Sequence, residues 1–243
     1  MGSFSHPLIR FKRMKTMCPD MKFTITGIMS QVLNVQLAPG DILKTAPGRL
    51  ISKSFNVNVK INDSAFISGL KKMFSDSFID MVEYSSEKGT GLVTVGPSVP
   101  GMIMDVDLRK GDWIMQKHGM LACSRGTAIS REMQRHLGDP QFDQEGLVLL
   151  KVSGDGTAFI ASCGDFTTMD LRPDDRYTVS TSHALAWESS VKYSIRSIRS
   201  KAEDTRDDDE CVTDFKGPGR IVIQNMSEGD MAGMVARFLS RNQ

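Results

Sequence analysis

Short runs of apolar and β-branched residues, separated by glycine-containing turns, make up most of this chain. Three of them place Gly-x-Gly ahead of a strand-like stretch: GTGLVTV (89–95), GDGTAFI (154–160) and GPGRIVI (217–223). β-branched and apolar residues favour strands, and glycine favours the turns that bound them. An alternating run that ends in leucine follows each of these stretches or precedes the next turn. The pattern predicts an all-β protein.

The same unit recurs along the chain. The Gly-x-Gly runs begin at residues 89, 154 and 217, which are spaced by 65 and 63 residues. A second element recurs at a similar spacing, as VQLAPGDILKTAPGRLIS from Val35, VDLRKGDWIMQKHGMLACS from Val106 and MDLRPDDRYTVSTSHALAWES from Met169. Two elements that share nearly one period indicate one supersecondary unit used three times. We therefore predict three intertwined β repeats that form one compact barrel or sandwich, a single β-repeat domain over residues 21–226.

The ends of the repeats bear on whether this unit closes. Either residues 22–27 or residues 220–224 provide the leading strand of the first repeat, and both segments have strand-like composition. If both align there, the two ends of the domain meet and the barrel closes. Matching the repeats by their turns places Gly48 opposite Gly119 and Leu50 opposite Leu121, 71 residues apart, and Leu185 opposite Leu121, 64 residues apart.

Aspartates recur at one turn of each repeat. Gly40 and Gly111 precede Asp41 and Asp112, and we expect both glycines to adopt a positive φ there. Asp174 takes the place of this glycine in the third repeat, and aspartate is one of the few other residues that tolerates such a conformation. We interpret these aspartates as turn residues in preference to catalytic carboxylates.

One stretch, LRKGDWIMQKHGMLACS (108–124), is dense in chemically capable side chains. It contains Trp113, Gln116, Lys117, His118 and Cys123, none of which has a chemical counterpart in the other two repeats. A scaffold whose decoration varies from copy to copy explains this better than a repeated site, although one copy specialised for chemistry stays an alternative. The sequence predicts no catalytic, cofactor-binding or metal-binding residues, and no enzyme activity.

Residues 64–74, SAFISGLKKMF, predict a short amphipathic helix after the first repeat. Its apolar residues fall near one face, with Lys71 and Lys72 beside it. Packing on the sheet is one explanation for this face, and peripheral contact with a membrane surface is the other.

The C-terminal residues 227–243 predict a second, longer amphipathic helix. Ser227 and Asp230 have the spacing of a capping box at its start. Its apolar stripe consists of Met231, Met234, Val235, Phe238 and Leu239, which follow helical periodicity. We expect this stripe to pack on its own domain, and the alternative is that it docks into a groove of a protein partner.

Charge and composition narrow the classes of function. The formal net charge of +1 offers no long-range attraction to nucleic acid, so nucleic-acid binding is disfavoured. No apolar run approaches the roughly 20 residues of a transmembrane helix, so we predict no transmembrane segment. Residues 1–20 carry four basic residues before the first acid, Asp20. This extension is typical of a mitochondrial targeting leader or of a basic tail.

Six stretches give the chain a family resemblance: MKFTITGIMSQVLNVQL (21–37), SGLKKMFSDSFI (68–79), PGMIMDVDLRKGDWIMQKHGMLA (100–122), EGLVLLKVSGDGTAFIASCG (145–164), HALAWESSVKYSI (183–195) and FKGPGRIVIQ (215–224). In this order they resemble the altered-inheritance-of-mitochondria biogenesis family, which has bacterial members. The resemblance implies three repeats like the fold of the tryptophan RNA-binding attenuator protein, and no established catalytic residue, metal or cofactor. NVKINDSAF (58–66) and SKAEDTRDDDEC (200–211) depart from glycine-rich family segments.

Pattern and resemblance together predict a non-enzymatic scaffold or assembly protein. We expect it to be mitochondrial, or otherwise cytoplasmic, and to act through protein contacts in a larger complex or in membrane organisation. Two alternatives stay open: RNA binding on a β-repeat edge, and a cupin-like metal enzyme. The four histidines, at positions 6, 118, 136 and 183, form no His-x-His pair of the kind that a cupin site uses.

Overall fold

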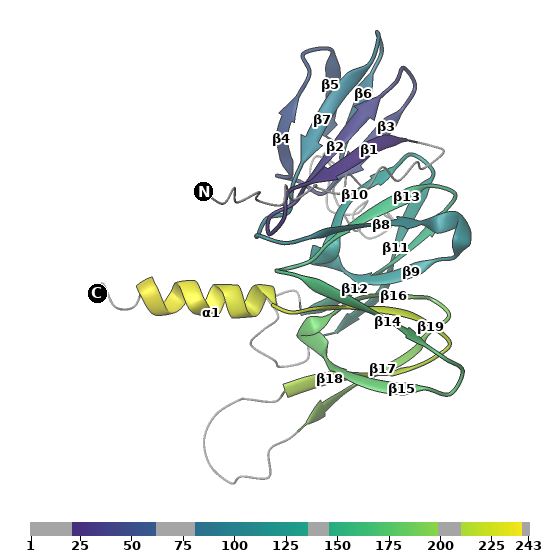
Figure 1. Ribbon diagram of the computed structural model, residues 1–243, viewed down its shortest axis with the longest axis vertical. Helices are drawn as coiled ribbons and strands as arrows, with labels where there is room; N and C mark the ends of the chain where they lie inside the picture. The colour runs from purple at the N-terminus through teal and green to yellow at the C-terminus, as the bar shows by residue number, and fades with distance from the viewer. Residues whose placement is uncertain (1–20, 62–80, 136–145, 199–209, 240–243) are drawn as a thin grey trace, which may run out of the picture.

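In the computed structural model, residues 21–61, 81–135, 146–198 and 210–239 are described, and they contain nineteen strands and one α-helix (Figure 1). The basic extension 1–20 and the helix expected at 64–74 lie outside the described residues. One strand, β1 (Lys22–Thr26), precedes the first repeat. The all-β class predicted from the sequence is confirmed.

Each repeat then contributes six strands. The first contains β2 (Val32–Leu37), β3 (Ile42–Thr45), β4 (Leu50–Lys53), β5 (Val57–Ile61), β6 (Val82–Ser86) and β7 (Gly91–Val95). The second contains β8 (Ile103–Asp107), β9 (Trp113–Gln116), β10 (Met120–Ser124), β11 (Thr127–Arg135), β12 (Leu147–Gly154) and β13 (Thr157–Ala161). The third contains β14 (Phe166–Leu171), β15 (Arg176–Ser180), β16 (Ala184–Glu188), β17 (Lys192–Ile198), β18 (Glu210–Lys216) and β19 (Gly219–Gln224). Helix α1 (Glu228–Leu239) follows the last strand.

Strand pairing repeats three times along the chain. The first and last strands of each repeat pair antiparallel, as β2 with β7, β8 with β13 and β14 with β19. The third strand of each repeat pairs with the same last strand, and the second strand pairs with the fifth. The three repeats predicted from the sequence are confirmed by this pattern.

Two further pairs join the repeats to one another. β3 of the first repeat pairs with β10 of the second, and β9 of the second pairs with β16 of the third. The result is four sheets, with strand orders β1-β2-β7-β4, β5-β6-β3-β10-β13-β8, β11-β12-β9-β16-β19-β14 and β15-β18-β17. Each of the two six-stranded sheets therefore contains strands from two repeats.

The sheets stack as layers, with the first repeat at the top of Figure 1 and the third at the bottom. None of the described sheets closes on itself, so the sandwich alternative holds and the barrel alternative is wrong. Residues 22–26 form β1 beside β2, whereas residues 219–224 form β19 in the third repeat. The two segments belong to different sheets, so the expectation that they align and close the barrel is also wrong.

Three apolar clusters fill the spaces between the four sheets. In the first, Phe23 of β1 meets Phe159 of β13 edge to face, with ring centroids 4.8 Å apart. The second contains Trp113 and Met115 of β9 opposite Ile160 of β13. In the third, Trp187 packs against Phe215. Strands of the two inner sheets are buried on both faces, which is why β9, β10 and β13 contain few exposed positions.

The predicted turn conformations are confirmed. Gly40, Gly111 and Asp174 all have a positive φ, of 93°, 146° and 71°. The carboxylates of Asp41 and Asp175 each accept a 2.8 Å hydrogen bond from the backbone N–H three residues earlier. These two aspartates therefore complete the turns. In the second repeat a 3₁₀ turn over Leu108–Lys110 replaces this arrangement, and Asp112 instead forms an ion pair with Lys151 at 3.1 Å.

The sequence alignment of the repeats is wrong by one residue at β4. Leu50, Met120 and Ala184 pair with Val95, Ile160 and Ile223, and each strand then skips one residue in its register. The skipped residues are Ile51, Leu121 and Leu185, so Leu121 aligns with Ile51 and not with Leu50. The predicted match of Leu121 with Leu185 is correct. We refer to these three as the bulge residues, since an unpaired extra residue in one strand is a β-bulge.

Candidate functional site

Helix α1 begins at a reciprocal capping box. The Ser227 hydroxyl accepts a hydrogen bond from the Asp230 backbone N–H at 3.0 Å, and the Asp230 carboxylate accepts one from the Ser227 N–H at 2.9 Å. These bonds satisfy two of the backbone donors that a helix start leaves without intrahelical acceptors. The predicted cap is confirmed, and it sets the direction in which the helix leaves β19.

Two side chains from other parts of the fold hold this helix start. The Cys163 thiol, which follows β13, lies 3.5 Å from the Ser227 carbonyl oxygen. His183 Nε2, which precedes β16, lies 3.8 Å from a carboxylate oxygen of Asp230. Sequence analysis did not identify either residue, because they are separated from the helix by 44 or more residues and no local pattern connects them to it. Their contacts join α1 to the second and third repeats.

The electrostatics at this start favour a charged carboxylate. The backbone N–H of Ser227 is the largest cause of the lowered pKa of Asp230, followed by the Ser227 hydroxyl hydrogen bond and by His183. Burial raises the pKa of the Cys163 thiol, and the carboxylates of Glu228 and Asp230 raise it further. A thiol with a raised pKa stays protonated near neutral pH, so Cys163 is suited to packing and not to nucleophilic attack.

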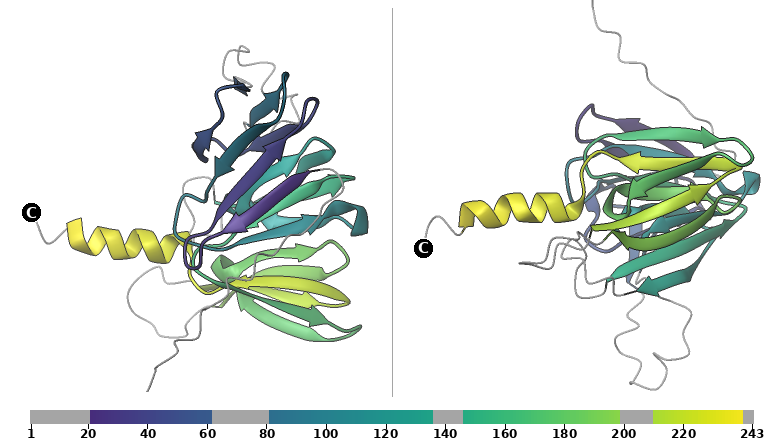
Figure 2. Two further views of the ribbon diagram at one scale, coloured as in Figure 1. Left: turned by 45° about the horizontal axis from the view of Figure 1, so that its top comes forward. Right: turned by 90° about the horizontal axis from the view of Figure 1, so that it is seen from below.

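Beyond its first turn, α1 leaves the stacked sheets and points away from them (Figures 1 and 2). Met231 is half-buried, but the side chains of Met234 and Val235 are 48% and 53% exposed. The expectation that the stripe packs on its own domain is therefore wrong for these two residues. Phe238 and Leu239 belong to the helix, and their side chains lie outside the description. The described part of the stripe is an apolar surface held away from the body.

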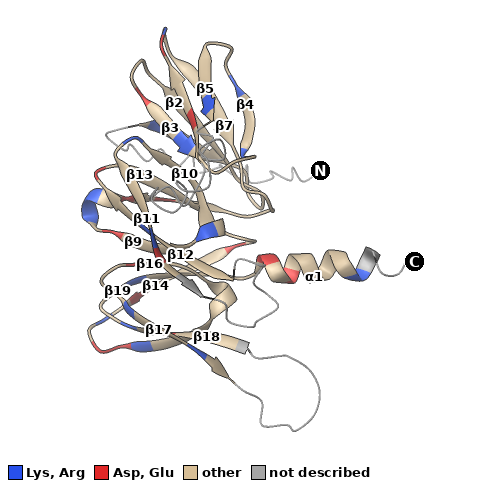
Figure 3. Ribbon diagram, turned by 180° about the vertical axis from the view of Figure 1, so that it is seen from behind, with Lys and Arg blue, Asp and Glu red and all other residues tan. Residues whose placement is uncertain are grey.

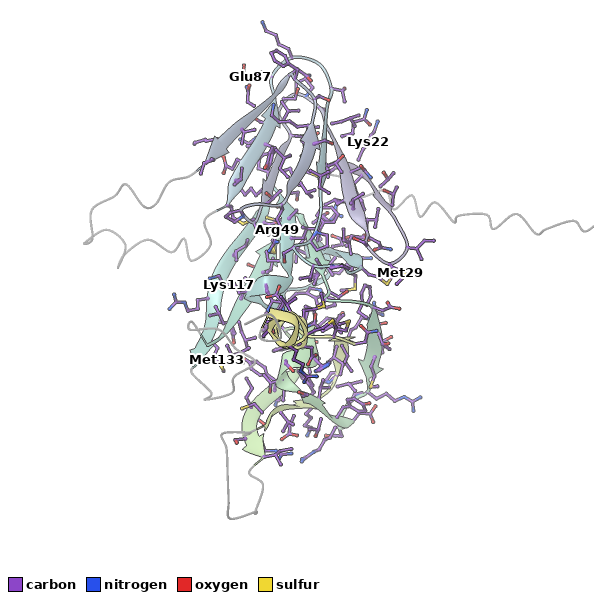
Figure 4. All side chains as sticks on the ribbon, turned by 90° about the vertical axis from the view of Figure 1, so that its left-hand side faces the viewer. Lys22, Met29, Arg49, Glu87, Lys117 and Met133 are labelled. Atoms are coloured by element: carbon purple, nitrogen blue, oxygen red, sulfur yellow. The ribbon has the colours of Figure 1, made fainter. Side chains whose placement is uncertain are left out.

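A small hollow lies beside the base of α1. Arg49, His118, Cys163 and Glu228 are among the side chains that line it, and its empty volume, counting space open to solvent, is about 260 Å³. Figure 4 shows this side of the molecule with α1 toward the viewer and with Arg49 and Lys117 labelled. Pockets that bind small ligands typically enclose roughly 300–1,000 Å³. This hollow is below that range and has no built set of converging polar groups.

The chemically dense stretch 108–124 has structural roles in the described fold. Trp113 is a core residue of β9. The buried Gln116 side chain donates hydrogen bonds of 2.6 and 2.8 Å to the backbone oxygens of Thr181 and Ala184, and so joins the second repeat to the third. Cys123 is fully buried, and burial raises the pKa of its thiol to about 12. These contacts support the interpretation of the stretch as architecture.

The residues behind the two alternative functions are also placed. His118 lines the hollow, and His183 contacts Asp230; no group of three metal-ligating side chains is present among the described residues. Tyr193, the tyrosine that stands beside basic residues in the sequence, packs on Trp187 with ring centroids 5.0 Å apart. Its ring therefore belongs to the core, where it is not available to stack on a nucleic-acid base.

Charge is spread over the molecule in small pairs. Figure 3 shows basic and acidic residues of both signs distributed along the strands on the face drawn there, with acidic residues at the start of α1. Arg196 with Asp214 and Arg220 with Asp170 form exposed ion pairs at 2.6 and 2.7 Å. Within the described residues, no helix is long and apolar enough to cross a membrane.

Fold and site together define a class: an all-β protein of three stacked repeats that presents an amphipathic helix at its C-terminal end. Residues 23–226 match the family described as Mitochondrial biogenesis AIM24, and the chain belongs to this family. The family resemblance stated from the sequence is confirmed. The likeness to the attenuator fold stays a prediction.

Two relatives from Streptococcus pyogenes extend this result. An uncharacterised protein of serotype M6 is 25% identical over 239 residues, which cover 94% of this chain and 95% of that protein. The crystal structure of another S. pyogenes protein superposes with a TM-score of 0.76 at 21% identity, covering 90% of this chain and 99% of that one. The second likeness shows a shared fold. The fold is thus present in bacteria as well as in a family named for mitochondrial biogenesis.

Proposed function

We propose that this protein is a non-enzymatic assembly protein of mitochondrial biogenesis, in which α1 docks into an apolar groove of a protein partner. The observation that carries the proposal is the projection of α1 from the body with Met234 and Val235 exposed. An isolated helix of 12 residues is marginal in water, so most helices of this length gain their stability from packing. A partner groove would provide that packing.

A protein groove suits α1 better than a lipid surface does. Helices that lie on membranes usually carry a polar face rich in lysine and arginine. The residues of α1 include two acids, Glu228 and Asp230, in the first turn and one base, Arg237, in the last. The acidic first turn would be repelled by anionic headgroups, whereas it complements the positive end of the helix dipole. The family membership supports mitochondrial biogenesis as the setting.

The test is the native size of the protein in its own cells. A gentle extract, fractionated to separate mitochondria, is resolved on a blue-native gel beside the purified protein, and the protein is detected with an antibody. We expect the protein to be in the mitochondrial fraction and in an assembly much larger than the purified protein. Migration of the extract sample with the purified protein would contradict the proposal.

Two substitutions tie that assembly to α1. Val235→Asp places a charge in the apolar stripe, and Ala236→Asp places the same charge one residue along, away from the stripe. Both changes cost a similar amount of helix propensity. We expect Val235→Asp to release the protein from the large assembly and Ala236→Asp to leave it there. Equal effects of the two variants would show that α1 does not dock through its apolar stripe.

A further inference from the structure

Two strands at opposite ends of the stack have an edge that their counterparts have paired. β4 ends the four-stranded sheet, although its counterparts β10 and β16 pair on that side with β3 and β9 of the preceding repeat. β15 ends the three-stranded sheet, although its counterparts are those same partners, β3 and β9. The other sheet ends, apart from β1, hold strands whose counterparts are edges in every repeat. Among the described strands, β4 and β15 are therefore the two halves of one missing junction.

The side chains at these edges show the same difference. The bulge residues Leu121 and Leu185 are each 1% exposed, because each packs into the cluster formed with the preceding repeat. The bulge residue of the first repeat, Ile51, has no preceding repeat and is 57% exposed.

At the other end, Tyr177 corresponds to Trp113. Both pair with the residue that stands two positions before a Gly-x-Gly turn, Phe215 and Val152 respectively. Trp113 is 6% exposed in the interior of the stack, and Tyr177 is 42% exposed at its end. An aromatic residue at this position is thus buried where a repeat follows and uncovered where none does.

We propose that a second copy of this chain covers each edge, with β4 of one copy pairing antiparallel to β15 of the next. The two internal junctions fix the register. Ala122 faces Thr45 in one junction and Ala186 faces Met115 in the other. Ser52 and Val179 occupy the corresponding positions, so Ser52 of one copy faces Val179 of the next, and Lys53 faces Thr178. The new sheet would have seven strands, four from one copy and three from the next.

The occupant is a second copy because each chain carries one edge of each kind. The edges lie in the first and third repeats, at opposite ends of the stack, so the geometry joins different chains head to tail (Figure 1). Such heterologous contacts build rings where the rotation closes and filaments where it does not. Features that commonly protect edges do not exclude pairing here. The bulge in β4 is also present in β10 and β16, which are paired.

This inference does not rest on the proposed function, because it uses β4 and β15 and makes no use of α1. Sedimentation velocity of the purified full-length chain over a range of concentrations is the experiment. We expect wild-type protein to associate beyond the monomer as concentration rises. We expect Ile51→Asp and Tyr177→Asp each to sediment as monomers, because each removes one half of the junction.

Mixing the two variants gives the sharpest result. The Ile51→Asp chain keeps a functional β15, and the Tyr177→Asp chain keeps a functional β4, so the mixture should form a heterodimer and nothing larger. Ile61→Asp and Ile198→Asp are the matched controls. They change exposed residues, 63% and 44% exposed, on β5 and β17, whose counterparts are sheet edges in every repeat. These controls should associate as wild type does.

Three results would overturn the proposal. The first is a wild-type chain that stays monomeric at every concentration. The second is loss of association in only one of the two variants, which indicates a symmetric contact through a single edge. The third is a mixture that does not form the heterodimer. Thermal unfolding of each variant confirms that the comparison is made between folded proteins.

Discussion

β10 and β4 hold the same place in successive repeats, yet all five residues of β10 are buried and all four residues of β4 are exposed. Both strands begin with two large apolar residues, contain a bulge and pair with the last strand of their own repeat. They differ in position: β10 lies inside a six-stranded sheet between two other sheets, whereas β4 ends an outer sheet. Burial in this fold is therefore set by the neighbouring repeat as much as by the composition of the strand.

The largest expected effect separates the two bulge residues. Leu121→Ala should lower the free energy of unfolding by about 2–5 kcal/mol, because it removes a buried side chain and leaves a cavity. Ile51→Ala should change it by less than about 0.5 kcal/mol at concentrations where the chain is monomeric, since this side chain is mainly exposed. Urea unfolding followed by circular dichroism measures both. Similar losses would show that the first repeat is as tightly covered as the second.

A second change acts on the junction between the second and third repeats. Gln116→Leu removes the donor to two buried carbonyl oxygens, those of Thr181 and Ala184. We expect a loss of about 2 kcal/mol in the free energy of unfolding, because buried polar groups without partners are costly. Gln36→Leu, at an exposed position of β2, is the control and should be nearly neutral. Equal stabilities of the two variants would contradict a structural role for Gln116.

A smaller effect concerns the turn that differs between repeats. Asp174 is the only non-glycine residue with a positive φ among the described residues, where its counterpart in the first repeat is Gly40. Asp174→Ala should cost about 1 kcal/mol, because alanine is strained in this conformation and lacks the short polar side chain that eases it. Asp174→Gly should retain wild-type stability to within about 0.5 kcal/mol, since the relieved strain offsets the added freedom of the unfolded chain. A melting temperature that fell equally in both variants would show that the Asp174 side chain matters more than its backbone.

The smallest effect is confined to α1. Because the pKa of Asp230 is lowered in the folded state, its contribution is present above the ordinary pKa of an aspartate and is lost as pH falls through the lowered value. We expect α1 to fray below about pH 4, with the sheets intact, because protonation weakens the capping box. NMR chemical shifts of the α1 residues during an acid titration measure this fraying.

Two variants test the cause of that fraying. Ser227→Ala should weaken the helix by about 1 kcal/mol at neutral pH. Asp230→Asn should remove most of the pH dependence of α1, because its side chain carries no titrating proton. A helix that frayed with pH in Asp230→Asn as it does in wild type would assign the effect to another group.

The repeating unit could be predicted from sequence because its turns impose strict local requirements. Gly40, Gly111 and Asp174 mark positions that few residues tolerate, and such positions recur visibly at a fixed period. The capping box at Ser227 is likewise local, since its two residues are three positions apart. Where the chemistry lies within a few residues, the sequence displays it.

The arrangement of the repeats and the surroundings of α1 could not be predicted in the same way. Alignment of Leu50 with Leu121 failed because a bulge moves the register without leaving a local signal. Whether β15 meets β4 depends on how far each repeat turns relative to the last, and this angle arises from packing along the whole stack. Periodicity showed which side of α1 is apolar, but an apolar stripe carries no information on what covers it.

The sharing of sheets between adjacent repeats has a consequence for the order in which the chain can fold. The four-stranded sheet is complete once residue 95 is available, the first six-stranded sheet once residue 161 is, and the second once residue 224 is. No strand has to wait for a partner from beyond the next repeat. A chain made from its N-terminus can therefore build its layers in succession during synthesis, with each finished layer serving as the template on which the next one condenses.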